Sequence, residues 1–137
     1  WVYGDAWVYG DARVSGNAWV YGDAWFSGNA RVSGDARVSG NAWVYGDAWV
    51  YGDARVSGNA QVSGDDWNKS PLQIRGTKQF VNMCTKKKIQ IGCSSFELSF
   101  CKTDEFKKLG KKNGYTEEQL IEYGLYIDLA IKLYPSE

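Results

Sequence analysis

The sequence predicts a mainly β protein, with a parallel β-solenoid followed by a small α+β domain. Two observations predict this fold. Residues 1–66 repeat one hexapeptide eleven times without a gap, in the general form (Trp/Arg)-Val-(Tyr/Ser)-Gly-(Asp/Asn)-Ala. A short fixed period of this kind is typical of a chain wound into stacked coils. Residues 67–137 lose the period and show short alternating segments and two helical patterns instead.

Each hexapeptide predicts one strand and one tight corner. Val8 and the Ala6 that precedes it by two positions lie on the same side of a strand, because successive side chains alternate between its two faces. We expect this pair to fill the interior in every repeat, with Phe26 replacing one Val. The variable Trp or Arg and Tyr or Ser then point outward. The Gly-Asp or Gly-Asn pair suits a tight corner, since Gly readily adopts positive φ.

The repeat resembles the hexapeptide-repeat proteins in its Val and in the small Ala two residues earlier. This resemblance implies a left-handed triangular parallel β-helix with three hexapeptides per coil, and a homo-oligomer that is commonly a trimer. Eleven repeats then give three full coils and two sides of a fourth. One departure is that Gly4 and its equivalents follow Tyr or Ser, where the transferases of that family usually place Gly directly after the aliphatic residue. Handedness therefore stays open.

Three hexapeptides per coil sort the outward side chains onto three faces. Exposed apolar patches of several hundred Å² usually mark an interface, and we predict a protein-binding surface of large aromatic side chains. Stabilisation of neighbouring coils by stacked rings is the alternative reading. The candidate partners are another copy, the C-terminal domain or a foreign protein. The predicted surface consists of Trp7, Trp25, Trp43, Tyr9 and Tyr45 on one face, and of Trp1 and Trp19 on the next.

The Asp and Asn residues of the corners have two interpretations. Asp35 is expected to lie over Asp53, and calcium-binding solenoids also place Asp at corners, in a longer and more Gly-rich repeat. Asn alternates irregularly with Asp in this chain, which suits a turn and dilutes like-charge repulsion. We favour the turn interpretation and predict neither a metal nor a cofactor.

The segment Trp67–Pro71 interrupts the pattern, and it predicts a boundary between a solenoid domain at 1–66 and an α+β domain at 67–137. We expect Lys86–Lys88 to form a hairpin turn, and Thr116 with Gln119 to form a capping box. The expected strands are 72–75, 79–84, 88–93 and 95–100, and the expected helices are about 104–109 and 116–134.

The end of the last coil needs protection, because an open coil exposes unpaired strand edges. We predict that the C-terminal domain caps this end and that Trp67 packs at the junction. The stretches 89–93 and 122–127 of this domain resemble the C-terminal domain attached to similar repeats in uncharacterised bacterial and prophage proteins. That resemblance implies a phage or mobile-element setting and supplies no activity.

The composition argues against catalysis. The chain contains no histidine, whereas hexapeptide-repeat acyltransferases use a His base and the carbonic anhydrases of that fold hold zinc through His. A Ser-His-Asp or Cys-His arrangement is equally impossible. We therefore predict no enzymatic activity, unless an upstream segment or a partner supplies the catalytic group. The chain begins at Trp1 in mid-pattern, from which we expect an incomplete or processed N-terminus.

The charged residues and the cysteines bear on the partners and the cellular compartment of the protein. The basic triplet Lys86–Lys88 could contact phosphates, but no neighbouring aromatic or Gly-rich element supports this, so we predict no nucleic-acid partner. No run of 18 apolar residues is present, which predicts no transmembrane helix. Cys84, Cys93 and Cys101 are an odd number without CxxC spacing. We interpret them as reduced thiols of a cytoplasmic protein, in a bacterium or a phage-infected host, with one disulfide left open.

Together these observations predict a non-catalytic structural and binding protein, in which the solenoid presents an aromatic-rich surface for self-assembly or partner binding. The expected partner is another copy, as in a trimer, or a host protein. Two other hypotheses stay open. One is a phage or mobile-element inhibitor of a host protein, and the other is a degenerate acyltransferase-like protein.

Overall fold

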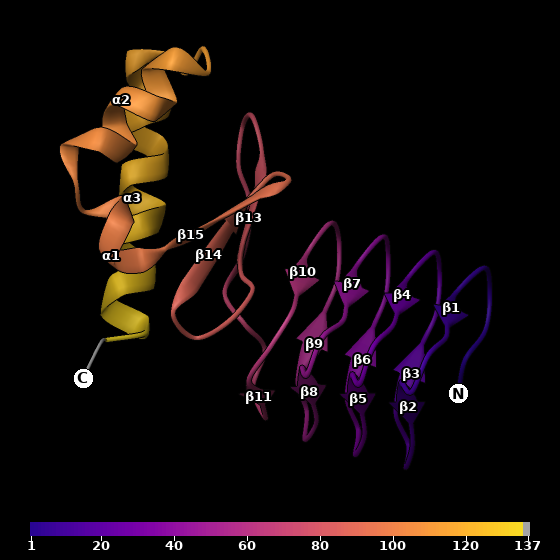
Figure 1. Cartoon of the computed structure of the whole chain (residues 1–137). Coiled ribbons are helices and arrows are strands. Elements are labelled where there is room, and N and C mark those ends of the chain that lie inside the picture. The colour runs from indigo at the N-terminus through magenta and orange to yellow at the C-terminus, as the bar shows by residue number, and fades with distance from the viewer. Residues whose placement is uncertain (136–137) are drawn as a thin grey trace.

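The computed structural model describes residues 1–135 and contains a solenoid that continues into an antiparallel sheet and three helices (Figure 1). Every strand of the solenoid is two residues long, and each falls on the Trp/Arg/Gln-Val position of a repeat or just after the last one. These strands are β1 (Trp7–Val8), β2 (Arg13–Val14), β3 (Trp19–Val20), β4 (Trp25–Phe26), β5 (Arg31–Val32), β6 (Arg37–Val38), β7 (Trp43–Val44), β8 (Trp49–Val50), β9 (Arg55–Val56), β10 (Gln61–Val62) and β11 (Asp66–Trp67).

Three parallel ladders form the three faces of the solenoid. They run β1-β4-β7-β10, β2-β5-β8-β11 and β3-β6-β9. Partners such as Trp7 and Trp25 are 18 residues apart, so three hexapeptides make one coil. The predicted parallel β-solenoid of about three coils is thus confirmed.

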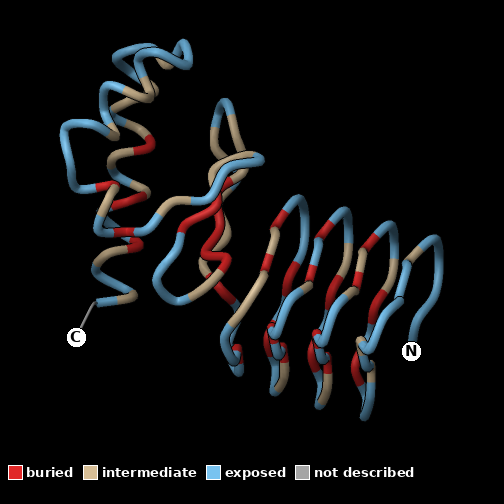
Figure 2. Tube along the Cα trace, in the orientation of Figure 1, coloured by how far each residue is buried: buried red, intermediate tan, exposed pale blue. Residues whose placement is uncertain are grey.

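The interior of the coils is filled by the Ala and Val of the repeat. From Ala18 to Val62 each of these residues, and Phe26 in place of one Val, has no exposed surface. In Figure 2 the buried segments line the inside of the coils and the corners are exposed. Two-residue strands suffice because the corners also bond from coil to coil. The backbone N–H of Asp23, for example, donates to the carbonyl of Gly40 at 3.0 Å.

The corner glycines meet two requirements at once. Gly40 has φ of +66°, and a Cβ there would lie 3.0 Å from the backbone nitrogen of Gly58 in the next coil. Both the left-handed conformation and the close approach of two backbones favour a residue without a side chain. The repeat therefore carries Gly at this position from Gly4 to Gly64.

The C-terminal region contains a four-stranded antiparallel sheet and three helices. In Figure 1 the sheet lies between the solenoid and the helices. The strands are β12 (Gln73–Arg75), β13 (Phe80–Met83), β14 (Lys88–Ile91) and β15 (Ser94–Glu97), and the helices are α1 (Leu98–Cys101), α2 (Asp104–Lys112) and α3 (Glu117–Leu133). The capping box of Thr116 and Gln119 at the start of α3 is confirmed.

Two elements differ from the sequence prediction. The strand expected at 95–100 ends at Glu97 and is followed by α1, because Leu98 and Cys101 are both buried at a helical spacing of three residues. The helix expected to end near Gly110 continues to Lys112. A Cβ at Gly110 would lie 2.8 Å from Cδ2 of Leu120, so this glycine serves the close packing of α2 on α3 and does not end α2.

The C-terminal region covers the last coil of the solenoid on each of its three faces. On one face β11 pairs with β8. On the second, Gln73 Oε1 accepts from the backbone N–H of Ser57 at 2.9 Å, and Gln73 Nε2 donates to the carbonyl of Arg55 at 2.8 Å. On the third, Asn82 Nδ2 donates to the carbonyl of Gln61 at 2.7 Å, and the N–H of Gln61 donates to Asn82 Oδ1 at 3.2 Å. These two side-chain amides replace the strands of a further coil.

Trp67 lies at the junction, as predicted. Its side chain is 3% exposed, its Nε1 donates to the carbonyl of Gly64 at 2.8 Å, and its ring contacts Tyr134 edge-on at 5.9 Å between centroids. The predicted hairpin of Lys86–Lys88 also touches the solenoid, because the N–H of Lys86 donates to Asp65 Oδ2 at 2.6 Å. The prediction that this region caps the solenoid is therefore confirmed.

Candidate protein-binding surface

Three indole rings form a stacked column on the face built by β1, β4 and β7. We call Trp7, Trp25 and Trp43 the tryptophan column. The ring centroids of Trp7 and Trp25 are 5.7 Å apart, and those of Trp25 and Trp43 are 5.2 Å apart with planes inclined by 7°. Parallel strands in register place equivalent side chains about 4.8 Å apart, which is a stacking distance for aromatic rings. The regular ladder thus creates the column from the repeat itself.

The tryptophan column remains partly exposed to solvent. Trp7 is 58% and Trp43 44% exposed, whereas Trp25 between them is half-buried. Among residues 1–135 the indole N–H groups of the column find no acceptor, whereas Trp49 Nε1 donates to Ser33 Oγ and Trp67 Nε1 to Gly64. The column therefore offers apolar ring edges together with three N–H donors.

The other predicted aromatic residues are divided between two faces. Tyr9 contacts the Trp25 ring edge-on at 5.9 Å and so extends the tryptophan column. Tyr45 lies half-buried on the same face, and in the described part of the chain it contacts no other aromatic ring. Trp1 and Trp19 lie on the adjacent face, where the guanidinium of Arg37 sits 5.5 Å from the Trp19 ring. The structure thus brings together four of the predicted residues.

The face of the tryptophan column carries no charge on its strands. Its fourth strand, β10, presents Gln61, and the residues after the four Val or Phe positions are Tyr or Ser. Each of the other two faces includes two outward arginines, at 37 and 55 on one and at 13 and 31 on the other. An uncharged aromatic face is the composition that interface centres favour over ordinary surface.

The corner residues form amide ladders. Asn17 Nδ2 donates to Asp35 Oδ1 at 3.4 Å, and Asn29 Nδ2 donates to Asp47 Oδ1 at 3.3 Å. The alternation of Asn with Asp thus converts a potential repulsion between carboxylates into hydrogen bonds. No three His, Cys, Asp or Glu side chains within residues 1–135 are arranged to hold a metal ion.

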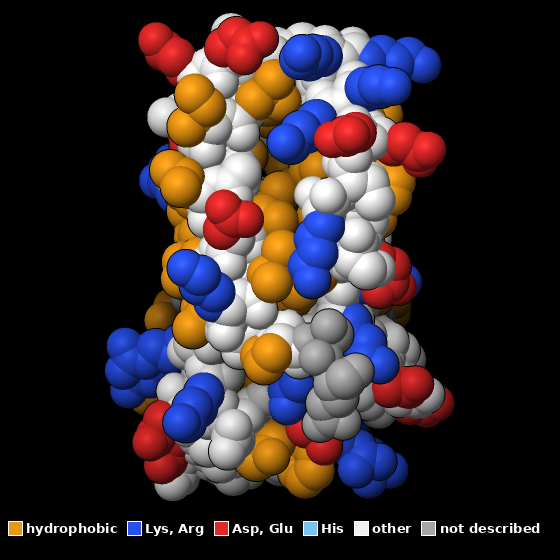
Figure 3. All heavy atoms as spheres, turned by 90° about the vertical axis from the view of Figure 1, so that its left-hand side faces the viewer, with side chains coloured by type: hydrophobic (Ala, Val, Ile, Leu, Met, Phe, Trp, Pro, Cys, Tyr) orange, Lys and Arg blue, Asp and Glu red, His pale blue; other side chains and the backbone are white. Residues whose placement is uncertain are grey.

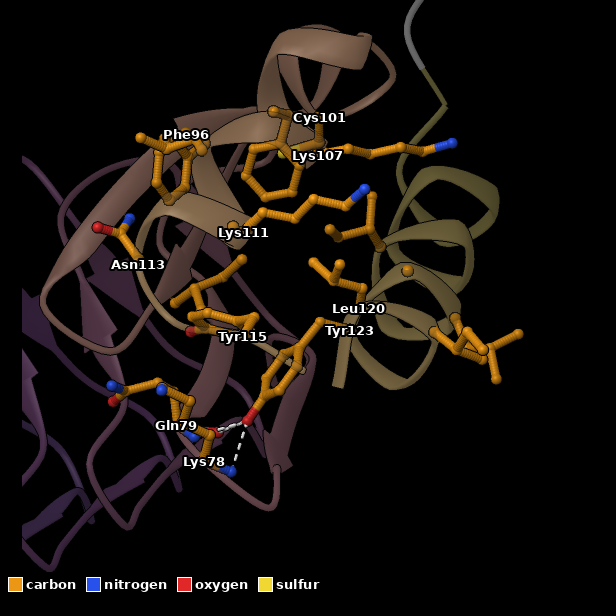
Figure 4. Close-up of a pocket in the computed structure, with 18 of the residues that line it drawn as sticks. Lys78, Gln79, Phe96, Cys101, Lys107, Lys111, Asn113, Tyr115, Leu120 and Tyr123 are labelled. Carbon is orange, nitrogen blue, oxygen red and sulfur yellow. Dashed lines mark hydrogen bonds between the residues drawn. The ribbon is translucent and has the colours of Figure 1, made fainter. Parts of the chain in front are cut away.

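A cleft lies between α2, α3 and the antiparallel sheet, and the sequence analysis did not predict it (Figure 4). This cleft has a volume of about 910 Å³ and an apolar lining that includes Phe96 and Leu120, with Lys107 and Lys111 also at its wall. Burial raises the pKa of the Cys101 thiol in its lining to about 11, so this cysteine stays protonated at neutral pH. The amphipathic pattern of α2 was the one sequence feature that could have indicated this cleft, but an ordinary helix packed on the core shows the same pattern.

A hydrogen-bond cluster fixes α3 against the loop between β12 and β13. Tyr123 Oη accepts from the backbone N–H of Gln79 at 2.6 Å, and Glu122 accepts from both the N–H and the hydroxyl of Thr77. Tyr126 donates to Glu122 Oε2 at 2.6 Å. The Thr77 hydroxyl lowers the pKa of Glu122, and the bond to Glu122 raises the pKa of Tyr126 to about 12. This cluster is structural, since Tyr123 and Glu122 join α3 to the loop and Tyr126 supports Glu122 from within α3.

Comparison with known families supports the repeat architecture. The model described as the YdcK β-solenoid repeat matches residues 6–22, 12–28, 30–46, 36–52 and 48–64. Each match spans nearly one coil of the structure. The chain is a repeat β-solenoid protein. The matches together cover less than half of its length and none of the C-terminal region. No curated protein and no solved structure matched the chain.

The β-solenoid fold fits a structural or binding role. Handedness and the relationship of the C-terminal region to phage proteins stay predictions. Among the described residues, no helix has both the length and the apolar character needed to cross a bilayer.

Proposed function

We propose that this solenoid is a non-catalytic structural and binding protein, and that the tryptophan column is its contact surface for another copy of the chain. The observation that carries the proposal is the column itself, a stack of three indoles standing on the one solenoid face without charged strand residues. The strands of two such faces can meet without bringing like charges together. Residues of this type supply most of the binding energy in protein interfaces.

Burial of the ring edges supplies the driving force for this contact. Aromatic side chains bury about 150–250 Å² each when fully covered, and Trp7 and Trp43 still expose about half of theirs. The unpaired indole N–H groups make the contact specific in geometry, since a partner that covers them must provide hydrogen-bond acceptors. The serine hydroxyls and backbone carbonyls beside the column on a second copy are acceptors of this kind.

The experiment is a measurement of molar mass in solution by size exclusion with light scattering, for the wild type and for Trp25→Gln. Glutamine already stands at the equivalent position 61 of the same ladder, so the substitution suits the fold. We expect the self-association constant to fall at least about tenfold, because Trp25 is the centre of the stack. The resemblance to hexapeptide-repeat proteins makes a trimer the expected assembly.

The matched control is Trp19→Gln, which removes an exposed indole from the adjacent face. It should leave the molar mass unchanged. An equal loss of association in both variants, or no loss in either, would contradict the proposal. Unchanged mass in Trp25→Gln would turn attention to a host protein as the partner, which is the function of a phage or mobile-element inhibitor.

The remaining expectations are part of the same proposal. The absence of histidine from the sequence supports a non-catalytic role over that of a degenerate acyltransferase. The three cysteines are free, which supports a reducing compartment such as the cytoplasm. A binding assay with coenzyme A tests the acyltransferase alternative, and stoichiometric binding would favour it.

A further inference from the structure

Helix α3 leaves an apolar stripe uncovered on its outer side. A row of large apolar side chains along a helix is normally buried against another element. The buried side of α3 uses Tyr123, Ile127 and Ala130. The opposite side presents four large aliphatic side chains at intervals of four residues, and each is between 43% and 66% exposed. They are Ile121, Leu125, Leu129 and Leu133.

The stripe lies on the outermost part of the molecule. In Figure 1, α3 stands on the side of the antiparallel sheet away from the solenoid. Figure 3 views this end directly and shows hydrophobic side chains between charged ones, beside the hollow between the helices. Ile121 and Leu125 also line the cleft between α2 and α3, so the stripe and the cleft form one continuous apolar surface.

The charges on this side of α3 are arranged symmetrically about Leu125. Glu118 lies seven residues before it and Lys132 seven residues after it, which is two helical turns in each direction. Ile121 and Leu129 lie four residues before and after it. Both charged side chains are exposed, and the only ion pair in residues 1–135 is elsewhere, between Lys88 and Glu97.

We propose that a second copy of the chain covers this stripe from Ile121 to Leu129, with the two α3 helices antiparallel and the two-fold axis at Leu125. In this arrangement Glu118 of each copy faces Lys132 of the other, and Ile121 of each faces Leu129 of the other. A parallel arrangement would instead place Glu118 on Glu118 and Lys132 on Lys132. Glu122 and Asp128 face acidic residues in both arrangements and favour neither.

The contact is expected to be weak and concentration-dependent. A helix of 17 residues is about 25 Å long, and a contact made by one such helix stays below the roughly 1,000 Å² of a stable interface. The dimer should therefore be studied over protein concentrations from micromolar to millimolar. The proposed dimer places the two solenoids at opposite ends of an elongated particle, and it leaves both tryptophan columns free to bind.

The test is sedimentation equilibrium with substitutions at the axis and at the charged pair. Leu125→Glu should weaken the dimer at least about tenfold, and circular dichroism should show an intact fold because Leu125 is 63% exposed. Glu118→Lys and Lys132→Glu should each weaken it about fivefold at low salt, and the double substitution should restore wild-type affinity. Glu105→Lys, a charge reversal in the first turn of α2, is the matched control and should have no effect.

Two results would overturn the proposal. If Leu125→Glu leaves the dissociation constant unchanged, α3 is not a self-contact. If Leu125→Glu weakens the dimer but the charge reversals have no effect, or only one of them does, the antiparallel register at Leu125 is wrong.

This inference and the proposed function can fail separately, because they use opposite ends of the molecule. Trp25→Gln should leave the α3 dimer intact, and Leu125→Glu should leave the assembly through the tryptophan column intact. The double variant should be a monomer of 15.3 kDa. A Trp25→Gln protein of unchanged mass that becomes monomeric with Leu125→Glu would support the α3 contact and contradict the self-assembly of the solenoid face.

Discussion

Removing the Asn82 side chain tests how the solenoid end is closed. Asn82 is 1% exposed, and its amide makes both hydrogen bonds that a further strand would make to Gln61. The Asn82→Ala variant leaves the N–H and the carbonyl of Gln61 without these partners. An unsatisfied buried polar group costs about 1–3 kcal/mol. Gln61 is half-buried, so we take the lower part of that range for each group.

The expected loss of unfolding free energy is therefore about 2–3 kcal/mol. For a chain of 137 residues this corresponds to a fall in Tm of about 6–15 °C. Urea denaturation followed by tryptophan fluorescence measures the free energy, and calorimetry measures Tm. Asn82→Leu keeps a similar side-chain volume without the amide, and it should lose about as much as Asn82→Ala.

Gln73→Ala is the matched control, since the half-buried Gln73 makes the same pair of bonds to Arg55 and Ser57, which are both exposed. Water replaces its partners there, so the loss should be at most about 1 kcal/mol. The reasoning is refuted if Asn82→Ala is as stable as the wild type within about 0.5 kcal/mol or is more stable than Gln73→Ala. A wild-type value for Asn82→Leu would show that the cap acts by packing alone.

Three further predictions concern single sites. Gly46→Ala should lower the free energy of unfolding by at least about 1–2 kcal/mol because of its φ of +63° alone, and its Cβ would also overlap the carbonyl of Ser63. Gly64→Ala is the control, since its Cβ would meet only Thr85 Cγ2 at 3.4 Å, and urea denaturation should show it to be nearly neutral. Cys93 is the exposed cysteine, so a thiol reagent should modify one thiol quickly and two only on unfolding, and Cys93→Ser should remove the fast phase. Because the pKa of Tyr126 is raised from 10.0 to about 12, the stability from its bond to Glu122 should be complete below pH 10 and lost as the pH rises towards 12. A spectroscopic titration of tyrosinate should show one pKa falling towards 10 in Glu122→Gln; no change between the two proteins would contradict the assignment.

The repeat made most of the solenoid predictable. Its period fixed which side chains point inward, and the 18-residue ladder then placed Trp7, Trp25 and Trp43 in one column. Tyr45 occupies a position equivalent to Tyr9 but makes no such contact in the described residues, because Gln61 stands where Tyr9 meets Trp25. The ladder gives the position of each ring, but the angle between stacked rings, 21° in one pair and 7° in the next, did not follow from the period.

The C-terminal region was harder to predict because its determinants lie far apart in the sequence. Gly110 reads as a helix end in isolation, and only the approach of Leu120 explains it. The capping roles of Gln73 and Asn82 have no local signal, because each amide bonds to backbone 16 to 21 residues earlier. The exposed stripe on α3 was hidden for a different reason. Large apolar residues occur on both sides of α3, and the sequence does not tell which side is left open.

Apart from the bond of Lys86 N–H to Asp65 Oδ2, the amide cap does not depend on which side chains the last coil carries. In the last coil, Gln73 and Asn82 bond only to main-chain atoms, those of Arg55, Ser57 and Gln61. Deleting one hexapeptide would leave the same Ala and Val core and an equally well-closed end, but it would rotate everything upstream by a third of a turn. The tryptophan column would then stand at a new angle to α3. Deleting three would restore the angle and shorten the rod by one coil. The length of the rod and the direction of its aromatic face can therefore change independently of its stability, in steps of six residues.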